Sequence, residues 1–166
     1  MTQDTSANCI SQEDRRSLVM SEIMTPNSAN YSGNVHGGHI LKLLDNVAYA
    51  CSSRYAGKNT VTLSVDQVFF KEPIYVGELV TFLATINYVG NTSLEVGIRV
   101  IAENLLTRLC RHTNTCYITM VAIDEHGKPI KIPALMIETQ VQVRRNTEAL
   151  IRKQARIQTQ SSASKK

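Results

Sequence analysis

The residues best suited to chemistry in this 166-residue chain lie between positions 34 and 45. Gly37 and Gly38 stand where a loop rich in Pro, Asn, Ser and Gly gives way to a helical pattern. Glycines there permit unusual backbone angles and leave the first N–H groups of the helix uncovered. Such groups, at the positive end of the helix dipole, suit a phosphate or a developing oxyanion. A tight turn that only allows close packing would use the same two glycines. The glycine pair alone therefore does not distinguish an anion-binding site from a structural turn.

Asp45 follows on the same predicted helix, at the border of its apolar stripe. A carboxylate beside a buried face is costly unless it is hydrogen-bonded or faces a cleft. One interpretation is a general base or nucleophile whose pKa is set by partial burial. The other is an acid at the edge of the stripe that reaches water. The spacing alone does not distinguish the two.

The pattern around these residues predicts one buried helix followed by strands. Residues 39–57 carry apolar side chains at i, i+3, i+4 and i+7, which predicts a helix of about 15 residues that ends near Gly57. The stripe consists of Ile40, Leu41, Leu44, Val47, Ala48 and Cys51. The period then changes to two, which predicts four long antiparallel strands over 60–66, 80–88, 94–102 and about 108–123. An edge strand over 17–24 and a helix that begins at Pro133 complete the order.

One long helix beside a long antiparallel sheet predicts the α+β class. Since one helix cannot cover such a sheet, an exposed edge or face is expected to bind a partner subunit. With 43% hydrophobic and 19% charged residues, the chain is expected to form one domain over 17–135. A polar N-terminal tail over 1–16, expected to be disordered, and a C-terminal helix with a basic tail over 136–166 flank this domain.

Composition excludes several classes of function. The net charge is +4, and seven of the Lys and Arg residues lie from position 144 onward against the single acid Glu148. This basic segment is expected to be a solvated helix face, since it has neither aromatic residues for base stacking nor a nucleic-acid-binding motif. No apolar run is long enough to span a membrane, and no signal sequence is recognisable.

The cysteines at 9, 51, 110 and 116 show no zinc-like spacing, which favours the reducing cytoplasm. Cys110, His112 and Cys116 alternate onto one face of a predicted strand, where a shared metal ion could be considered. The outer two would lie roughly 20 Å apart, however, so a metal site is rejected.

Four segments of the chain resemble the acyl-CoA thioesterases of the hotdog fold, in particular the cytosolic long-chain acyl-CoA hydrolases and their short bacterial single-domain relatives. The segments occur in the family's order, and the resemblance covers roughly 18–135. They are GNVHGGHILKLLD (33–45), TVTLSVDQVFFKEPIYVGELV (60–80), GNTSLEVGIRV (90–100) and DEHGKPIKIP (124–133).

The resemblance implies a curved antiparallel sheet wrapped around one central helix, and protomers that pair edge to edge, commonly as a trimer of dimers. It implies an active site at the dimer interface, with Asn34 from one protomer and Asp45 from the other. Backbone N–H groups near Gly37 and Gly38 would polarise the thioester, and Asn34 would orient the water or the carbonyl. Asp45 would activate water or attack directly. No metal or cofactor is expected, because coenzyme A is part of the substrate.

Contacts to coenzyme A are predicted for a hairpin turn and two cations, namely Gly90, Asn91, Thr92, Ser93, Lys71 and Arg99. An ordinary turn and a solvent-facing arginine explain the same residues equally well. The alternatives to a thioesterase are a non-catalytic acyl-CoA sensor, an acyl-CoA hydratase and a structural assembly protein. A hydratase needs a His–Asp pair that the sequence does not place, and a sensor does not need a carboxylate such as Asp45 beside the thioester.

Overall fold

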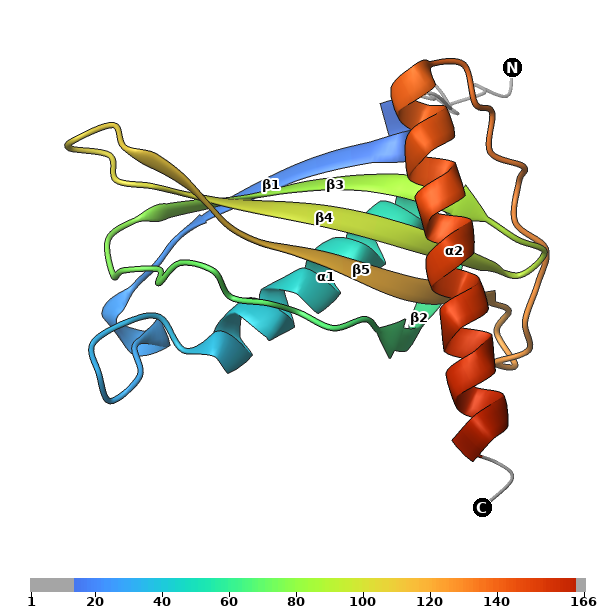
Figure 1. Cartoon of the computed structure of the whole chain (residues 1–166), viewed down its shortest axis with the longest axis horizontal. Coiled ribbons are helices and arrows are strands. Elements are labelled where there is room, and N and C mark those ends of the chain that lie inside the picture. Colours follow the sequence, from blue (N-terminus) through green and yellow to red (C-terminus); the bar gives the residue numbers. More distant parts are fainter. Residues whose placement is uncertain (1–13, 164–166) are drawn as a thin grey trace, which may run out of the picture.

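The computed structural model describes residues 14–163 and contains five strands and two long helices (Figure 1). Short 3-10 helices precede strand β1 and helix α1. In chain order the elements are η1 (Asp14–Arg16), β1 (Ser17–Ile23), η2 (Pro26–Ser28), α1 (Gly37–Ala56), β2 (Asn59–Val65), β3 (Leu79–Val89), β4 (Ser93–Glu103), β5 (Cys110–Ile123) and α2 (Gln140–Ala163). Most of the predicted tail over 1–16 therefore lies outside the described residues.

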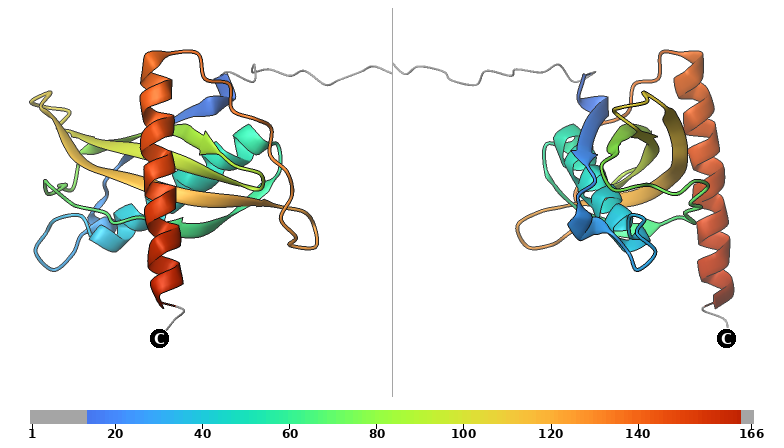
Figure 2. Two further views of the ribbon diagram at one scale, coloured as in Figure 1. Left: turned by 45° about the vertical axis from the view of Figure 1, so that its right-hand side comes forward. Right: turned by 90° about the vertical axis from the view of Figure 1, so that its left-hand side faces the viewer.

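All five strands belong to one antiparallel sheet with the order β1-β3-β4-β5-β2. The sheet curls around α1, whereas α2 lies against the opposite, outer face (Figure 2). This arrangement confirms the predicted curved sheet around one central helix. The sheet has two edges, β1 and β2, because β1 pairs only with β3 and β2 pairs only with β5.

Helix α1 supplies the centre of the core. Its predicted stripe is buried with one exception, and the left-handed backbone of Gly57, at φ 64°, ends the helix as expected. The exception is Leu41, which is 42% exposed because Leu43 takes the buried position in its place. Leu41 instead begins a second stripe with Asp45 and Tyr49, at i, i+4 and i+8, which faces away from the core.

Helix α2 begins at Gln140 and not at Pro133 as predicted. The Thr139 hydroxyl accepts from the Gln142 N–H, and the Gln142 side chain accepts in turn from the N–H of Thr139. This reciprocal capping box fixes the start of the helix. Residues 133–139 form neither helix nor strand and lead the chain past the end of the sheet to that start (Figure 1).

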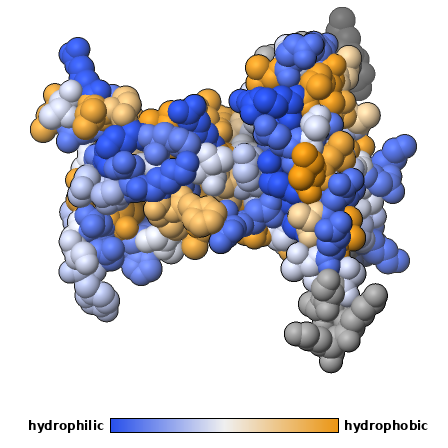
Figure 3. All heavy atoms as spheres, in the orientation of Figure 1, coloured by the Kyte–Doolittle hydropathy of each residue, from blue (hydrophilic) through white to orange (hydrophobic). Residues whose placement is uncertain are grey.

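The expectation that the basic segment is a solvated helix face is wrong for part of α2. The Arg152 and Arg156 side chains are only 22% and 21% exposed, because they point at the sheet and pair with acids there. The exposed surface of α2 carries hydrophobic residues interspersed with polar ones (Figure 3). The exposed apolar residues of the helix are Val141, Val143, Leu150, Ile151 and Ile157.

In the part of the chain that the structure describes, neither helix is long and apolar enough to cross a bilayer. The cytoplasmic location stays a prediction from cysteine usage.

The environments of the cysteines predict selective alkylation. Burial raises the pKa of the Cys51 thiol and of the Cys116 thiol to about 12 each, whereas Cys110 is exposed. At pH 8 the two buried thiols are therefore almost entirely protonated and should resist iodoacetamide, while Cys110 reacts. Peptide-resolved mass spectrometry checks this, with a sample unfolded in guanidinium as the control in which all thiols react. Equal labelling of Cys51 and Cys110 in the native protein would contradict the packing.

The contact between Arg152 and Glu95 predicts a stability difference between two arginine variants of α2. Arg152→Met leaves the fully buried Glu95 carboxylate without its strongest partner and should lower the free energy of unfolding by about 3 kcal/mol. Arg144→Met removes only an exposed i, i+4 pair with Glu148 and should cost about 0.5 kcal/mol or less. Urea unfolding of both variants measures the difference. Equal losses in the free energy of unfolding would show that the buried pair stabilises the protein no more than the exposed pair does.

Candidate active site

The first turn of α1 is capped by a histidine. The Gly38 N–H donates to His36 Nδ1 at 2.9 Å, and a Cβ on Gly38 would lie only 3.1 Å from this nitrogen. The expectation that both glycines leave free N–H groups is therefore wrong for Gly38, whose N–H satisfies the cap. Among the described residues Gly37 N–H has no acceptor, and the Phe70 ring lies beside this glycine. Gly37 is thus the backbone donor available to an oxyanion.

The loop before α1 places two asparagines beside Gly37. Asn34 forms an isolated bridge with Tyr75, and its N–H donates to the Asn30 side-chain oxygen at 3.2 Å. Asn30 Oδ1 also accepts from the Ser32 N–H at 2.8 Å. A pocket at this helix end is lined by Asn30, Asn34, Val35, Gly37, Ile40, Phe70, Glu72, Pro73 and Ile74. The structure thus brings Asn34 and Gly37 together as predicted, and adds Asn30 and Phe70.

Asp45 lies two turns further along α1, and its carboxylate is exposed in the single chain. The Thr62 hydroxyl of β2 donates to Asp45 Oδ1 at 2.6 Å. The predicted partial burial is therefore not present in one protomer, because the stripe that carries Asp45 faces away from the core. Thr62 is not predicted as a site residue from the sequence, where its only signal is a polar position between Val61 and Leu63.

In one chain the two predicted halves of the site lie apart. Gly37 and Asp45 are eight residues apart on the same helix, which separates them by about 12 Å along its axis. A general base and an oxyanion donor must both lie within about 3 Å of the groups on which they act, around one carbonyl carbon. The two halves of the predicted site therefore cannot act on the same thioester unless a second chain supplies one of them.

The surroundings of Asp45 have the character of an interface. Strand β2 pairs on one side only, with β5, so the other edge of its backbone is unpaired in the single chain. Exposed apolar side chains occur on both α1 and β2: Leu41 and Tyr49 share the helix stripe of Asp45, and β2 carries the exposed Val61, Leu63 and Val65. Thr62 faces α1, so its neighbours Val61 and Leu63 lie on the other face of the strand. An open strand edge flanked by apolar side chains is the kind of surface that pairs with another chain.

The predicted coenzyme A contacts lie in two places. Lys71 and Arg99 line neighbouring grooves on the outer face of the sheet, and both grooves include Thr115 and Tyr117. The turn over 90–93 lies at the other end of β3 from Gly37, a strand of 11 residues. There the Asn91 and Thr92 carbonyls accept from Ile132 and Ala122. The structure therefore separates the turn from the two cations and gives its backbone a role in holding 130–132.

Comparison with known proteins places these features in a family. The model of the Thioesterase superfamily matches residues 32–109, which include both halves of the site. Protein VdlD of Helicobacter pylori is 56% identical over 147 residues, which cover 89% of this chain and 84% of that protein. YkhA of Bacillus subtilis, named an uncharacterized acyl-CoA thioester hydrolase, is 30% identical over 135 residues, covering 81% of this chain and 78% of YkhA.

The fold is also that of a solved thioesterase. The crystal structure of an apo-hexameric acyl-CoA thioesterase superposes with a TM-score of 0.84 at 32% identity. The match covers 87% of this chain and 93% of that one. The similarity thus extends over the sheet, α1 and much of the remaining chain.

Proposed function

Because this chain belongs to the thioesterase superfamily, we propose that it hydrolyses acyl-CoA thioesters to a free carboxylic acid and coenzyme A. The observation that carries the proposal is the hydrogen bond from Thr62 to Asp45, which fixes one carboxylate oxygen and leaves the other free beside an open strand edge. The names of YkhA and of the hexameric thioesterase support the substrate class.

In the proposed reaction Asp45 Oδ2 supplies the basic oxygen. It either takes a proton from the attacking water or attacks the carbonyl itself to form an anhydride that water then opens. In the first route water adds to the thioester carbonyl and the C–S bond then breaks. In the second the C–S bond breaks as the anhydride forms, and water then adds to the anhydride and frees Asp45. In both routes the thiolate of coenzyme A leaves and takes up a proton, and the sum is one water consumed for one acid and one thiol formed. Thr62 keeps Oδ1 in place, so that Oδ2 presents a defined direction to the substrate.

The site is proposed to form between two copies of the chain. When two β2 edges meet antiparallel, the two α1 helices run in opposite directions, and Gly37 of one protomer approaches Asp45 of the other. Asn34 and the Gly37 N–H then lie on one side of the thioester and the carboxylate on the other. The 12 Å spacing along one helix, about 1.5 Å per residue, supports this arrangement, as do the exposed apolar residues at the β2 edge. Further assembly into a trimer of dimers is part of the proposal.

A hydratase is a weaker explanation of the same residues. It would need a histidine paired with an aspartate at the site, which here means Asp45. His36 instead caps α1 and His39 lies 3.5 Å from Glu22, while the partner of Asp45 is a hydroxyl. Within the described residues, no histidine is therefore paired with Asp45.

Replacing the carboxylate should abolish turnover without unfolding the protein. Asp45→Ala should lower kcat about a thousand-fold, since positioned general acid–base groups contribute roughly that much. The measurement is thiol release from acyl-CoA esters of short to long chain, with Glu125→Ala, which removes a fully solvent-facing carboxylate, as the matched control. Full activity in Asp45→Ala would contradict the proposed mechanism. A wild-type protein that binds coenzyme A but releases no thiol would favour the alternative function of a non-catalytic acyl-CoA sensor.

Mixing two inactive variants tests whether each site spans two chains. In a heterodimer of Asn34→Ala and Asp45→Ala, one site carries both substitutions and the other carries neither. Such a heterodimer, purified by two different tags, should therefore recover about half of the wild-type turnover, because each dimer keeps one of its two sites. Each variant refolded with itself serves as the control. No recovery in a verified heterodimer would contradict the shared site.

A further inference from the structure

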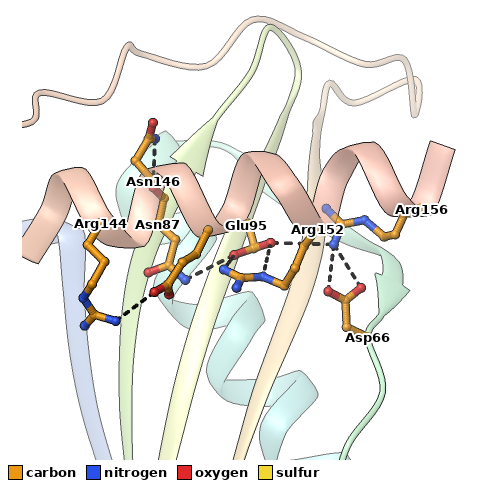
Figure 4. Close-up of polar contacts among 8 residues, drawn as sticks. Asp66, Asn87, Glu95, Arg144, Asn146, Arg152 and Arg156 are labelled. Atoms are coloured by element: carbon orange, nitrogen blue, oxygen red, sulfur yellow. Dashed lines mark hydrogen bonds and ion pairs between the residues drawn. The ribbon is translucent and has the colours of Figure 1, made fainter. Parts of the chain in front are cut away.

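Arg156 of α2 holds the end of the edge strand that carries Thr62. Its Nη1 lies 2.9 Å and 2.8 Å from the two carboxylate oxygens of Asp66, the residue that directly follows β2. The same nitrogen lies 3.6 Å from Glu95 Oε2 of β4 (Figure 4). The Arg156 and Asp66 side chains are 21% and 16% exposed. A contact between residues 90 positions apart thus joins the C-terminal helix to the edge strand.

Arg156 is held in a fixed place because the neighbouring arginine locks α2 onto the sheet. Glu95 is 1% exposed and accepts from Arg152 Nη2 at 2.7 Å and from Arg152 Nε at 3.2 Å, as well as from Asn87. Burial alone would lower the pKa of Arg152, but its hydrogen bonds to Glu95 and the charge of that carboxylate outweigh burial and raise it. The Arg152 guanidinium also lies 3.6 Å from the centre of the Tyr117 ring.

Arg156 holds the end of β2 that lies beyond an irregularity, whereas Thr60 near the start of the strand bonds Ser52 and Ser53 of α1. Strand β2 has one neighbour, and its ladder with β5 shifts register between Thr62 and Ser64. Beyond this irregularity the ladder contains Ser64 and Val65, and the Asp66 N–H donates to the Tyr117 carbonyl at 2.9 Å. Thr62 lies only four residues, about 13 Å, before Asp66. A shift of Asp66 along or away from the sheet therefore moves the donor that orients Asp45.

The other half of the proposed site also begins at Asp66. The chain from 66 to 78 leads to Phe70, whose ring lies beside Gly37, and to Tyr75, which pairs with Asn34. Asp66 is therefore the point from which one segment runs back to Thr62 and another runs forward to the pocket at the start of α1.

We propose that Arg156 is a positioning residue for the reaction: by binding Asp66 it fixes the register and direction of β2, and through Thr62 it fixes the orientation of the Asp45 carboxylate. The inference rests on the proposed thioesterase function. Helix α2 lies on the outer face of the sheet, yet by this proposal it helps to position Asp45, which lies on the face covered by α1. Arg156 touches neither Asp45 nor Thr62, so its effect must pass through the strand.

The test is Arg156→Met with Lys153→Met as the matched control. Both substitutions remove one cation of α2, but within residues 14–163 the hydrogen bond and the ring contact of Lys153 are both with Tyr88. Arg156→Met should lower kcat about ten-fold with KM little changed, since a displacement of about 1 Å at a catalytic group can cost up to about a hundred-fold. Arg156→Lys keeps a cation that can reach the Asp66 carboxylate and should therefore retain most of the wild-type kcat. Lys153→Met should have the kcat and KM of the wild type.

A double substitution separates positioning from general loosening. In a Thr62→Val background the route from Arg156 to Asp45 is already broken, so Arg156→Met should cause no further loss of kcat. The proposal would be overturned if the double variant lost kcat by the product of the two single losses. It would also be overturned if Lys153→Met lost as much kcat as Arg156→Met.

If circular dichroism shows that Arg156→Met does not fold, Asp66→Asn takes its place. This variant keeps the shape of the side chain, and the same loss of kcat is expected. A wild type without turnover would overturn the proposed function and this inference together, whereas an active wild type with an unaffected Arg156→Met variant would overturn this inference alone.

Discussion

The rise of an α-helix, 1.5 Å per residue, is the constraint on which the proposed site depends. Gly37 and Asp45 share one rigid helix, and no motion of loops can bring them closer than about 12 Å along its axis. The exposure of Asp45, the unpaired edge of β2 and the exposed apolar side chains of that strand are then explained together by the proposed dimer. In it, a second chain covers this surface and the two halves of the site meet.

An edge strand that must bind a partner has two conflicting requirements. Its outer side has to stay free for pairing, yet its side chains have to stay in register with the helix behind it. Strand β2 meets the first by pairing only with β5, and the hydrogen bond between Thr62 and Asp45 is of use only if the second is met. Helix α2 acts from the outer face of the sheet, where the Arg156–Asp66 pair holds the strand without occupying its free edge. The buried Glu95 carboxylate, paired with Arg152, fastens α2 to the same face of the sheet.

The regular elements could be predicted because each follows from a period within a short segment. The alternation of 80–88 and 94–102 and the stripe of 39–57 needed no knowledge of distant residues, and the strands agree within a few residues. Glu95 shows where this approach stops: it alternates with Leu94 and Val96 as a solvent-facing residue would, and only α2 buries it. Thr62 is similar, because a bond to a residue 17 positions earlier depends on how helix and sheet pack. The start of α2 could have been found from the Thr139–Gln142 spacing of a capping box.

The capped helix start also changes which groups can act in the proposed reaction. An oxyanion usually receives two donors, and Gly38 N–H already satisfies His36, so the backbone of α1 offers only Gly37 there. The second donor must then come from a side chain, and the pocket contains two amides. Asn30 is the better oriented of the two, because the N–H groups of Ser32 and Asn34 fix its Oδ1 and thereby direct its NH₂ group. The backbone N–H of Asn34 contributes to that arrangement, and in the proposed site the side chain of Asn34 keeps its own role of orienting the water or the carbonyl.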